Sequence, residues 1–406
     1  MRYGSLSDHF TGIVAKRLTA VEADTAVSNQ HEFNGVAALK ELLGSERFER
    51  RPSRFLWLGG ENESISDDAP VTWYDARERH ETRTEWRLYF KSNAVMEAAS
   101  AGDLLVVGRR PDGDVLFLIA PQGSTLENQI AWLFGLDGEL GAGFRFEGFT
   151  GDRDRGLDFV SNFVLEEIGI EPEEPEGERL DRILEPLGLD FPPSREMSRL
   201  ARTNLADIDP RDDPDAALLA WIEFEEALFR RLERRIVAAR LQNGFITDDA
   251  ADVEGFLKFS LSVQNRRKSR MGLSLENHVE AALKALNIRY ARGARTEARS
   301  KPDFLFPGAA EYADPTFEAT RLAMLGVKST LKERWRQVLA EAARIQEKHL
   351  LTLEPGISIH QTDEMRSHGL QLVVPQGLHA TFTPAQAAWL IDFRCFLSHV
   401  QAKQAA

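Results

Sequence analysis

The feature that most constrains the fold is a short acidic segment near the middle of the chain. Residues 170–178 read IEPEEPEGE, with five glutamates, two prolines and no apolar residue after Ile170. Such a segment repels itself, is stiffened by proline and offers nothing to a hydrophobic core. We therefore expect a linker at 170–178 between two separately folded parts of this 406-residue chain, residues 1–169 and 179–406.

The residues before the segment have the pattern of a mostly β domain. Short apolar runs rich in Val, Leu, Phe and Trp are separated by turn-forming residues. The sequence Pro-Asp-Gly at 111–113 predicts a hairpin between the last two of these runs. The expected strands are 53–60, 70–76, 84–90, 103–110 and 114–121.

The residues after it alternate between helical and strand patterns, which predicts an α/β layered domain. A long helix is expected at 216–241, capped by Asp212–Asp215 and stopped by Asn243-Gly244. Ser274 should cap a second helix at 275–287, and Thr383-Pro384 should open a closing helix at 383–400. Between them we expect strands at 303–306, 322–327, 349–354 and 370–375 and a helix at 332–346.

Charge is unevenly distributed along the chain. The total is −14, but residues 256–350 hold eighteen Lys or Arg against ten Asp or Glu, a net +8, which leaves −22 on the remainder. A basic segment within an acidic chain is compatible with nucleic acid, because binding depends on the local field. The chain has no apolar run long enough for a membrane helix and no signal-peptide pattern at its start, so we expect it in the cytosol.

A single cysteine excludes two kinds of protein. Cys395 cannot form an intrachain disulfide framework or a cysteine-based zinc site. It lies in an apolar stretch, where we expect a small buried side chain.

Three residues suit a metal-dependent phosphodiesterase. They are Glu276, Asp303 at the start of an expected strand, and Lys328 at the end of another. Carboxylates hold Mg²⁺ against the scissile phosphate, and a lysine can orient water and stabilise developing charge. Such sites usually have an acid two residues before the lysine, where this chain has Gly326. Glu341 could supply the missing carboxylate; the alternatives are a turn aspartate, a solvated lysine and a helix-surface glutamate.

Two clusters suit contact with DNA. In Lys332-Glu333-Arg334 the cations could donate to guanine and the glutamate could accept from cytosine, although a solvated first helical turn is the alternative. The run 265–270 could follow a phosphate backbone through four cations, or could be a solvated loop. These cations are Arg266, Arg267, Lys268 and Arg270.

Several of these segments together resemble the catalytic half of EcoRII-type restriction endonucleases. The resemblance rests on 262–283, 301–307, 325–345, 348–358, 361–365 and 370–376, and the segments QHEFNG and TEWRLYF extend it into the amino-terminal half. It implies a PD-(D/E)XK nuclease core with a displaced carboxylate. Asp303 and Glu341 would bind Mg²⁺, and Lys328 would organise the attacking water. Glu276 would complete the acidic cluster, with Glu280, one turn further along the same face, as the alternative. Lys332, Glu333 and Arg334 would read the bases.

The same resemblance implies that the amino-terminal half is an effector domain. It would be a β pseudobarrel similar to the plant B-three-type DNA-binding domain and would grip a second copy of the target. The contact residues would be His31, Asn34, Arg87, Lys91 and Asn93. His31 could equally be a surface histidine, and Arg87 with Tyr89 could simply be the outward face of a strand.

The function that the resemblance implies is a Mg²⁺-dependent type II, IIE-like restriction endonuclease in a prokaryotic cytoplasm. It would cut duplex DNA as a homodimer at a CC-x-GG type site, with CCWGG the first to test. A second effector site would stimulate cutting by relieving autoinhibition. The alternative is a non-catalytic DNA-binding regulator whose nuclease domain has lapsed.

Overall fold

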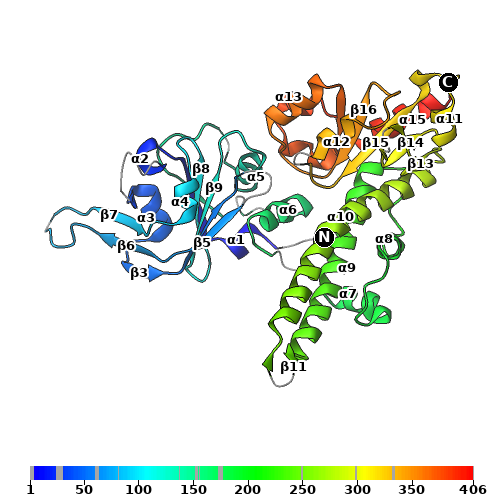
Figure 1. The fold of residues 1–406 in the computed structure, drawn as a ribbon. Coiled ribbons are helices and arrows are strands. Elements are labelled where there is room, and N and C mark those ends of the chain that lie inside the picture. The colour runs from blue at the N-terminus through cyan, green and yellow to red at the C-terminus, as the bar shows by residue number, and fades with distance from the viewer. Residues whose placement is uncertain are drawn as a thin grey trace. The chain divides into compact units, whose positions relative to one another are not determined.

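The computed structural model describes residues 4–23, 31–59, 64–80, 82–136, 138–150, 154, 156–171, 177–247, 250–297, 300–331 and 334–405. Backbone contacts divide the chain into two compact units. The amino-terminal unit is Arg2–Glu173 with Gly356–His360, and the carboxyl-terminal unit is Glu174–Pro355 with Gln361–Ala406. Figure 1 labels their helices and strands.

The linker expected at 170–178 is narrower than its composition indicated. Residues 172–176 lie outside the described part of the chain. On one side Ile170 is buried, because its apolar side chain packs with the preceding segment. On the other, Gly177 and Glu178 already belong to helix α7, where a glutamate in the first turn suits the helix dipole.

The amino-terminal unit contains two sheets. The larger has the order β10-β1-β8-β9-β4-β5, and the smaller β2-β7-β6-β3. All pairs are antiparallel except β4 with β9. The strands are β1 (Gly12–Arg17), β2 (Glu32–Asn34), β3 (Phe48–Arg51), β4 (Ser53–Trp57), β5 (Ile65–Asp68), β6 (Val71–Asp75), β7 (Trp86–Phe90), β8 (Leu104–Arg109), β9 (Val115–Ala120) and β10 (Arg145–Gly148). The helices are α1 (Leu6–His9), α2 (Ala20–Ala23), α3 (Ala37–Leu43), α4 (Ala94–Ala98), α5 (Thr125–Leu133) and α6 (Phe159–Glu167).

Both sheets enclose one hydrophobic core. Phe55 and Phe117 of the larger sheet stack at 4.1 Å between ring centroids, and Phe90 of the smaller sheet packs against them. The predicted hairpin is confirmed, since Arg109 pairs with Val115 and Gly113 takes the positive φ that the turn requires. The expectation of a mostly β amino-terminal unit is therefore confirmed, and its strands form two sheets among the described residues.

The carboxyl-terminal unit is the expected α/β domain, built on a sheet of order β13-β14-β15-β16-β17. Its first three strands are antiparallel and its last three parallel. The strands are β13 (Ala291–Arg292), β14 (Phe304–Phe306), β15 (Ala323–Lys328), β16 (Lys348–Thr352) and β17 (Leu370–Val373), with a small pair β11 (Ile246–Thr247) and β12 (Ala250–Ala251). The helices are α7 (Gly177–Leu184), α8 (Ser194–Thr203), α9 (Pro214–Gln242), α10 (Val253–Ala285), α11 (Ala309–Ala313), α12 (Trp335–Leu339), α13 (Ile359–Ser367), α14 (Pro384–Ala387) and α15 (Phe393–Ala405).

The two long helices differ in how well their ends were predicted. Helix α9 begins as expected, with the Asp213 side chain accepting from the Ala216 amide. Ser274 does not cap a helix: α10 starts at Val253 and runs through Ser274, which is buried. Figure 1 shows α10 alongside α9, and ion pairs such as Arg267–Glu233 at 2.5 Å join them, so packing carries the helix through the expected break.

The two later helices expected from the sequence are both shorter. Helix α12 ends at Leu339 instead of 346, because the chain turns at Ala342, whose φ is 49°. Thr383 does cap a helix with Pro384 at its first position, but α14 stops at Ala387. The chain then pairs Ile391 with Val373, and the buried Asp215 accepts from the amides of Phe393 and Arg394 to start α15.

Cys395 is exposed on α15, so its expected burial was wrong: it faces away from the side that buries Phe393, Phe396 and Val400. Among the helices of the described residues, none has the length and apolar content needed to cross a membrane.

His349 on the inner strand β16 makes stability depend on pH. It is 3% exposed, its Nδ1 has no hydrogen-bond partner among the described residues, and burial together with the charges of His399 and Lys403 lowers its pKa to about 3. Between pH 6.5 and 3 the unfolded chain protonates this imidazole and the folded chain does not, so stability falls on acidification by about 1.4 kcal/mol per pH unit.

We predict that His349→Leu removes this contribution. Between pH 6.5 and 5, urea unfolding should show the native protein losing about 2 kcal/mol more than the variant. His368→Leu, at an exposed position of the same unit, is the control for replacing a histidine by leucine. Equal losses in the native protein and His349→Leu would contradict the assignment.

Candidate active site

Asp303 and Lys328 meet at the ends of two neighbouring strands. Asp303 directly precedes β14, and Lys328 is the last residue of β15, which pairs antiparallel with β14 (Figure 1). Asp303 Oδ2 accepts from the Val327 amide at 2.6 Å and from Lys328 Nζ at 2.7 Å. Both side chains are about one-fifth exposed, so they form a partly buried ion pair that still reaches solvent.

Glu341 contributes a second carboxylate to this site from the turn after α12. Burial, together with the negative charge of Asp303, raises its pKa to about 7, although the charges of Lys328 and Lys348 act to lower it. Its Oε2 is buried without a hydrogen-bond partner among the described residues. A buried, unsatisfied carboxylate oxygen next to another carboxylate is a position that attracts a proton or a cation.

Glu276 is the member of the α10 pair that faces this site. Burial, together with the charge of Asp303, raises the pKa of Glu276. The hydrogen bond from Arg292 and the charge of Lys328 oppose this rise without cancelling it. The Glu280 carboxylate instead accepts from the Tyr290 hydroxyl at 3.0 Å and from Arg292 at 2.7 Å, and burial opposes these contacts, which lower its pKa. Of the two acids left open by the sequence, Glu276 is therefore the candidate site residue.

Arg292 was not singled out from the sequence, yet it organises the acids of α10. Its guanidinium donates to Glu276 at 2.9 Å, to Glu280 at 2.7 Å and to the Asn277 side chain at 2.9 Å. Arg292 lies on the two-residue strand β13, outside any recognisable motif, so no local signal marks it.

The carboxylate oxygens present suit a hard divalent cation that also keeps water or phosphate ligands. They do not suit a cation that is bound by protein side chains alone. Among the described residues no three His, Cys, Asp or Glu side chains gather closely enough to hold a metal alone. Asp303 and Glu341 nevertheless offer carboxylate oxygens as ligands, and the charges of Asp303 and Lys328 both act on Glu341. Mg²⁺ commonly binds one or two carboxylates and completes its shell with water and substrate phosphate.

Of the expected base-reading triplet, the structure describes Arg334. Lys332 and Glu333 lie outside the described residues. Arg334 is the N-cap of α12, is exposed, and donates to the carbonyl and hydroxyl oxygens of Thr330 at 2.7 and 2.6 Å. Its guanidinium is thus held at the start of a helix on the segment that follows Lys328.

The basic run 265–270 lies within α10, which corrects the alternative of a solvated loop. Arg270 is buried, pairs with Glu226 and lies over the Phe229 ring at 3.9 Å, so it serves the α9–α10 interface and not a phosphate. Arg267 pairs with Glu233 at 2.5 Å. Arg266 is exposed and lies over Phe191, and the Lys268 side chain is outside the described residues.

The residues proposed for effector DNA lie on or beside two adjacent strands, since β2 pairs with β7 and Asn34 with Arg87. Asn34 and Lys91 are exposed. Arg87 faces outward with Tyr89, but its guanidinium pairs with Glu32 and Glu85. His31 is half-buried with its ring near Phe90, so it is not a simple surface histidine.

Asn93 does not suit a DNA contact. It is buried, its Oδ1 accepts from the Met96 amide as the N-cap of α4, and its Nδ2 donates to the Lys91 carbonyl. Its polar groups are therefore used within the fold, and the correction follows from the preference for asparagine at helix starts.

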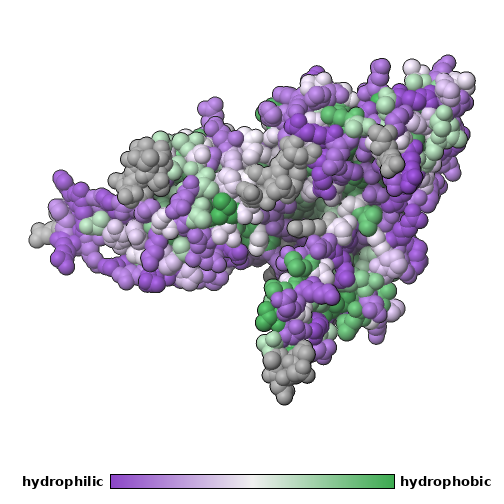
Figure 2. All heavy atoms as spheres, viewed as in Figure 1, coloured by the Kyte–Doolittle hydropathy of each residue, from purple (hydrophilic) through white to green (hydrophobic). Residues whose placement is uncertain are grey.

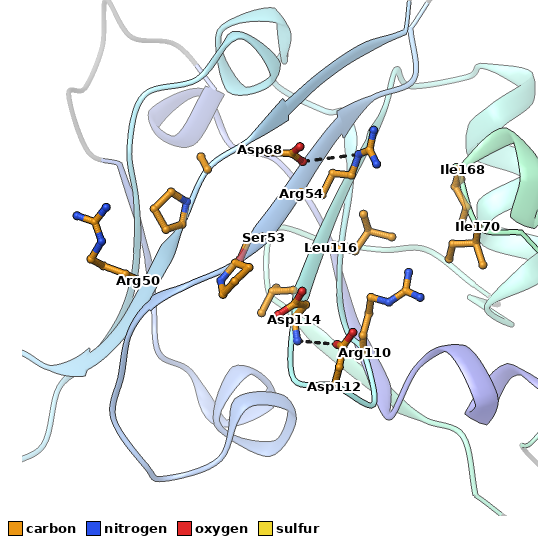
Figure 3. A pocket seen from close by; sticks show the side chains of 15 residues that line it. Arg50, Ser53, Arg54, Asp68, Arg110, Asp112, Asp114, Leu116, Ile168 and Ile170 are labelled. Atoms are coloured by element: carbon orange, nitrogen blue, oxygen red, sulfur yellow. Dashed lines mark hydrogen bonds and ion pairs between the residues drawn. The ribbon is translucent and has the colours of Figure 1, made fainter. Parts of the chain in front are cut away.

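The amino-terminal unit also contains a cavity of about 620 Å³ that the sequence did not indicate. Figure 3 shows arginine and aspartate side chains around it, with Arg54 paired to Asp68 at 3.7 Å. Its charged lining is Arg50, Arg54, Arg110, Asp68, Asp112 and Asp114. These charges balance, so the cavity has no net preference for an anion such as phosphate.

The region that holds the carboxylate site matches a known family. Residues 229–397 match the model described as EcoRII C terminal. These residues are thus similar to the EcoRII C-terminal domain. The type II restriction enzyme EcoRII of Escherichia coli is 42% identical over 189 residues, which cover 46% of this chain and 46% of that enzyme. The match thus spans just under half the length of the relative.

Solved structures resemble the chain more weakly. Metal-depleted Ecl18kI in complex with uncleaved DNA has 18% identity and a TM-score of 0.45, covering 56% of this chain and 84% of that one. A PspGI–substrate DNA complex has 17% identity and a TM-score of 0.43, covering 52% and 93%. The similarity to the EcoRII C-terminal domain therefore rests on the sequence match.

We predict that Arg270 of this domain stabilises the fold and does not contribute to DNA affinity. Burial opposes ionisation of Glu226, but Arg270 and Arg230 outweigh it and lower its pKa. Arg270→Gln should therefore cost about 3 kcal/mol in urea unfolding, because it breaks a buried ion pair. Arg266→Gln, at an exposed position four residues earlier, should cost under about 1 kcal/mol. A specific loss of DNA affinity by Arg270→Gln, without loss of stability, would refute this.

Proposed function

We propose that this protein is a divalent-metal-dependent type II restriction endonuclease that cuts duplex DNA. The proposal rests on one partly buried site. In this site Asp303 pairs with Lys328, and Glu341 has a carboxylate oxygen without a hydrogen-bond partner among the described residues. This site lies within the region that matches the EcoRII C-terminal family. The relative named EcoRII is a type II restriction enzyme, which supports the same class of reaction here.

In the mechanism we propose, Asp303 and Glu341 would hold Mg²⁺. When bound, the cation supplies Lewis-acid stabilisation to the scissile phosphate. Lys328, fixed by Asp303 at 2.7 Å, orients the attacking water and stabilises negative charge that develops on the phosphate. Glu276 adds negative charge beside Asp303, and Arg292 holds it in place.

We expect Asp303→Asn or Glu341→Gln to lower cleavage at least 100-fold while the DNA dissociation constant changes less than about threefold. Each substitution removes a carboxylate ligand but no base contact. Cleavage of plasmid DNA with and without Mg²⁺, alongside gel-shift binding, measures both quantities.

Glu347→Gln is the matched control, since Glu347 is exposed six residues beyond Glu341. It should cut like the native protein. A native protein that binds DNA but never cuts it would instead favour the non-catalytic regulator.

For specificity, we propose that Lys332, Glu333 and Arg334 read a CC-x-GG type site, with CCWGG the first sequence to test. The exposed position of Arg334 at a helix start supports this. Arg334→Ala should lose about 1–3 kcal/mol of discrimination at a G·C pair. Equal loss of affinity for specific and random duplexes would mean that Arg334 contacts phosphate.

We propose that the protein acts as a homodimer, whose symmetry suits a near-palindromic site. Helix α10 exposes an apolar stripe at helical spacing, and Figure 2 shows hydrophobic residues gathered over the lower part of α9 and α10. The stripe is Val253, Phe256, Leu257 and Leu261, between 45% and 60% exposed. Analytical sedimentation measures the oligomeric state. If it shows only monomers, this proposal is rejected.

We further propose that the amino-terminal unit binds a second copy of the site and that this stimulates cutting, as in a type IIE enzyme. Exposed Asn34 and Lys91, on or beside the paired strands β2 and β7, are the candidate contacts. The proposed function also places the protein in a prokaryotic cytoplasm. Equal cleavage rates on one-site and two-site plasmids would argue against effector stimulation.

A further inference from the structure

Glu341 is held by a turn and not by a helix. Its amide donates to the Val338 carbonyl at 3.1 Å, and α12 ends before it. The next residue, Ala342, is fully buried with φ at 49°, a region in which a residue with a Cβ is strained. A strained turn persists only if its surroundings hold it, so the position of the Glu341 carboxylate depends on neighbouring contacts.

Arg344 provides the strongest of these contacts. Its guanidinium donates to the carbonyl oxygens of Tyr312, of Asp314 at 2.9 Å and of Phe317 at 2.7 Å. Three carbonyls from the end of α11 and the loop that follows it thus converge on one planar side chain three residues beyond Glu341. The rigid fork of donors in arginine suits this arrangement, and a lysine could not reproduce it.

The hydroxyl of Tyr312 connects the same turn to Glu297. It donates to Glu297 at 2.6 Å and accepts from the Arg344 amide at 3.3 Å, while Glu297 also accepts from the Ala343 amide at 3.3 Å. Burial and the Glu297 charge raise the pKa of Tyr312 to about 12, so the hydroxyl keeps its proton. Two consecutive amides after Ala342 are therefore fixed from this side.

Lys348 closes the turn at its other end. Its buried Nζ donates to the Ile345 carbonyl at 2.9 Å, and the Ile345 amide donates to the Ala342 carbonyl at 2.9 Å. The hydrogen bonds of Arg344, Tyr312 and Lys348 described above hold the turn. None of these hydrogen bonds is to Asp303, to Lys328 or to the Glu341 carboxylate.

We propose that Arg344, with Tyr312, is a positioning residue that fixes the Glu341 carboxylate for divalent cation binding. The inference rests on the proposed function, and it adds residues that do not touch the metal or the DNA. Partners that orient a metal ligand typically change metal affinity 10- to 100-fold when removed. Loss of Arg344 should therefore weaken the cation site without altering the DNA surface.

The test measures Mn²⁺ affinity by electron paramagnetic resonance. The full-length protein is bound to a phosphorothioate-protected duplex of a sequence that the native protein is first shown to cleave. Arg344→Gln should raise the Mn²⁺ dissociation constant about tenfold, Arg344→Lys should recover only part of the affinity, and Tyr312→Phe should raise the constant about threefold. The Mg²⁺ concentration for half-maximal cleavage should shift in the same order, while DNA affinity without metal stays within twofold.

Arg394→Gln is the control for a purely structural effect, because Arg394 also donates to a backbone carbonyl, that of Asp212 at 2.7 Å. It should leave Mn²⁺ affinity unchanged. An unchanged Mn²⁺ constant in Arg344→Gln would overturn the inference even if cleavage fell. If circular dichroism shows that Arg344→Gln does not fold, Tyr312→Phe decides, and an unchanged constant there overturns it. A native protein that cuts no duplex would reject the proposed function instead.

Discussion

The ion pair between Asp303 and Lys328 depends on the pairing of β14 with β15, and the proposed chemistry depends on that ion pair. The strands pair Phe304 with Leu325, which brings the residue before one strand against the end of the other. Asp303 Oδ2 then accepts from both the Val327 amide and the Lys328 ammonium. A one-residue slip in register would turn these side chains to the opposite face of the sheet and would separate the pair. The buried faces of β14 and β15 therefore position the site.

Local signals in the sequence were sufficient where the stabilising group lies nearby in the chain. Pro-Asp-Gly at 111–113 correctly predicted the β8–β9 hairpin, and Asp213 correctly predicted the start of α9. They failed where the stabilising group is distant. Helix α10 continues through Ser274 because it packs on α9, and α15 starts at Phe393 because Asp215, some 180 residues earlier, accepts from its first amides.

The candidate site shows the same division. The types and order of Glu276, Asp303 and Lys328 could be read from the sequence, and the structure brings them together. Glu341 was expected on a helix, but the turn at Ala342 carries it, because contacts made by Arg344 and Lys348 favour a bend that no propensity indicates. Arg292 could not be found from the sequence, since its role comes only from facing α10.

The basic charge of residues 256–350 also has a different meaning in the folded protein. Arg270 serves the α9–α10 interface, Arg292 holds two acids, and Arg344 and Lys348 hold the turn after Glu341. Part of the local excess of +8 therefore supports the fold and the carboxylate site. The cations available for the proposed contact with DNA are those that remain exposed, such as Arg266 and Arg334.

The central claim is that Asp303 and Glu341 together hold a divalent cation beside Lys328. Anomalous scattering from Mn²⁺ in crystals of the protein with an uncleavable duplex tests it most directly. The account predicts a peak within coordination distance of oxygens from both carboxylates, which disappears in Asp303→Asn. A peak bound by other residues, or one that contacts neither carboxylate, would contradict it.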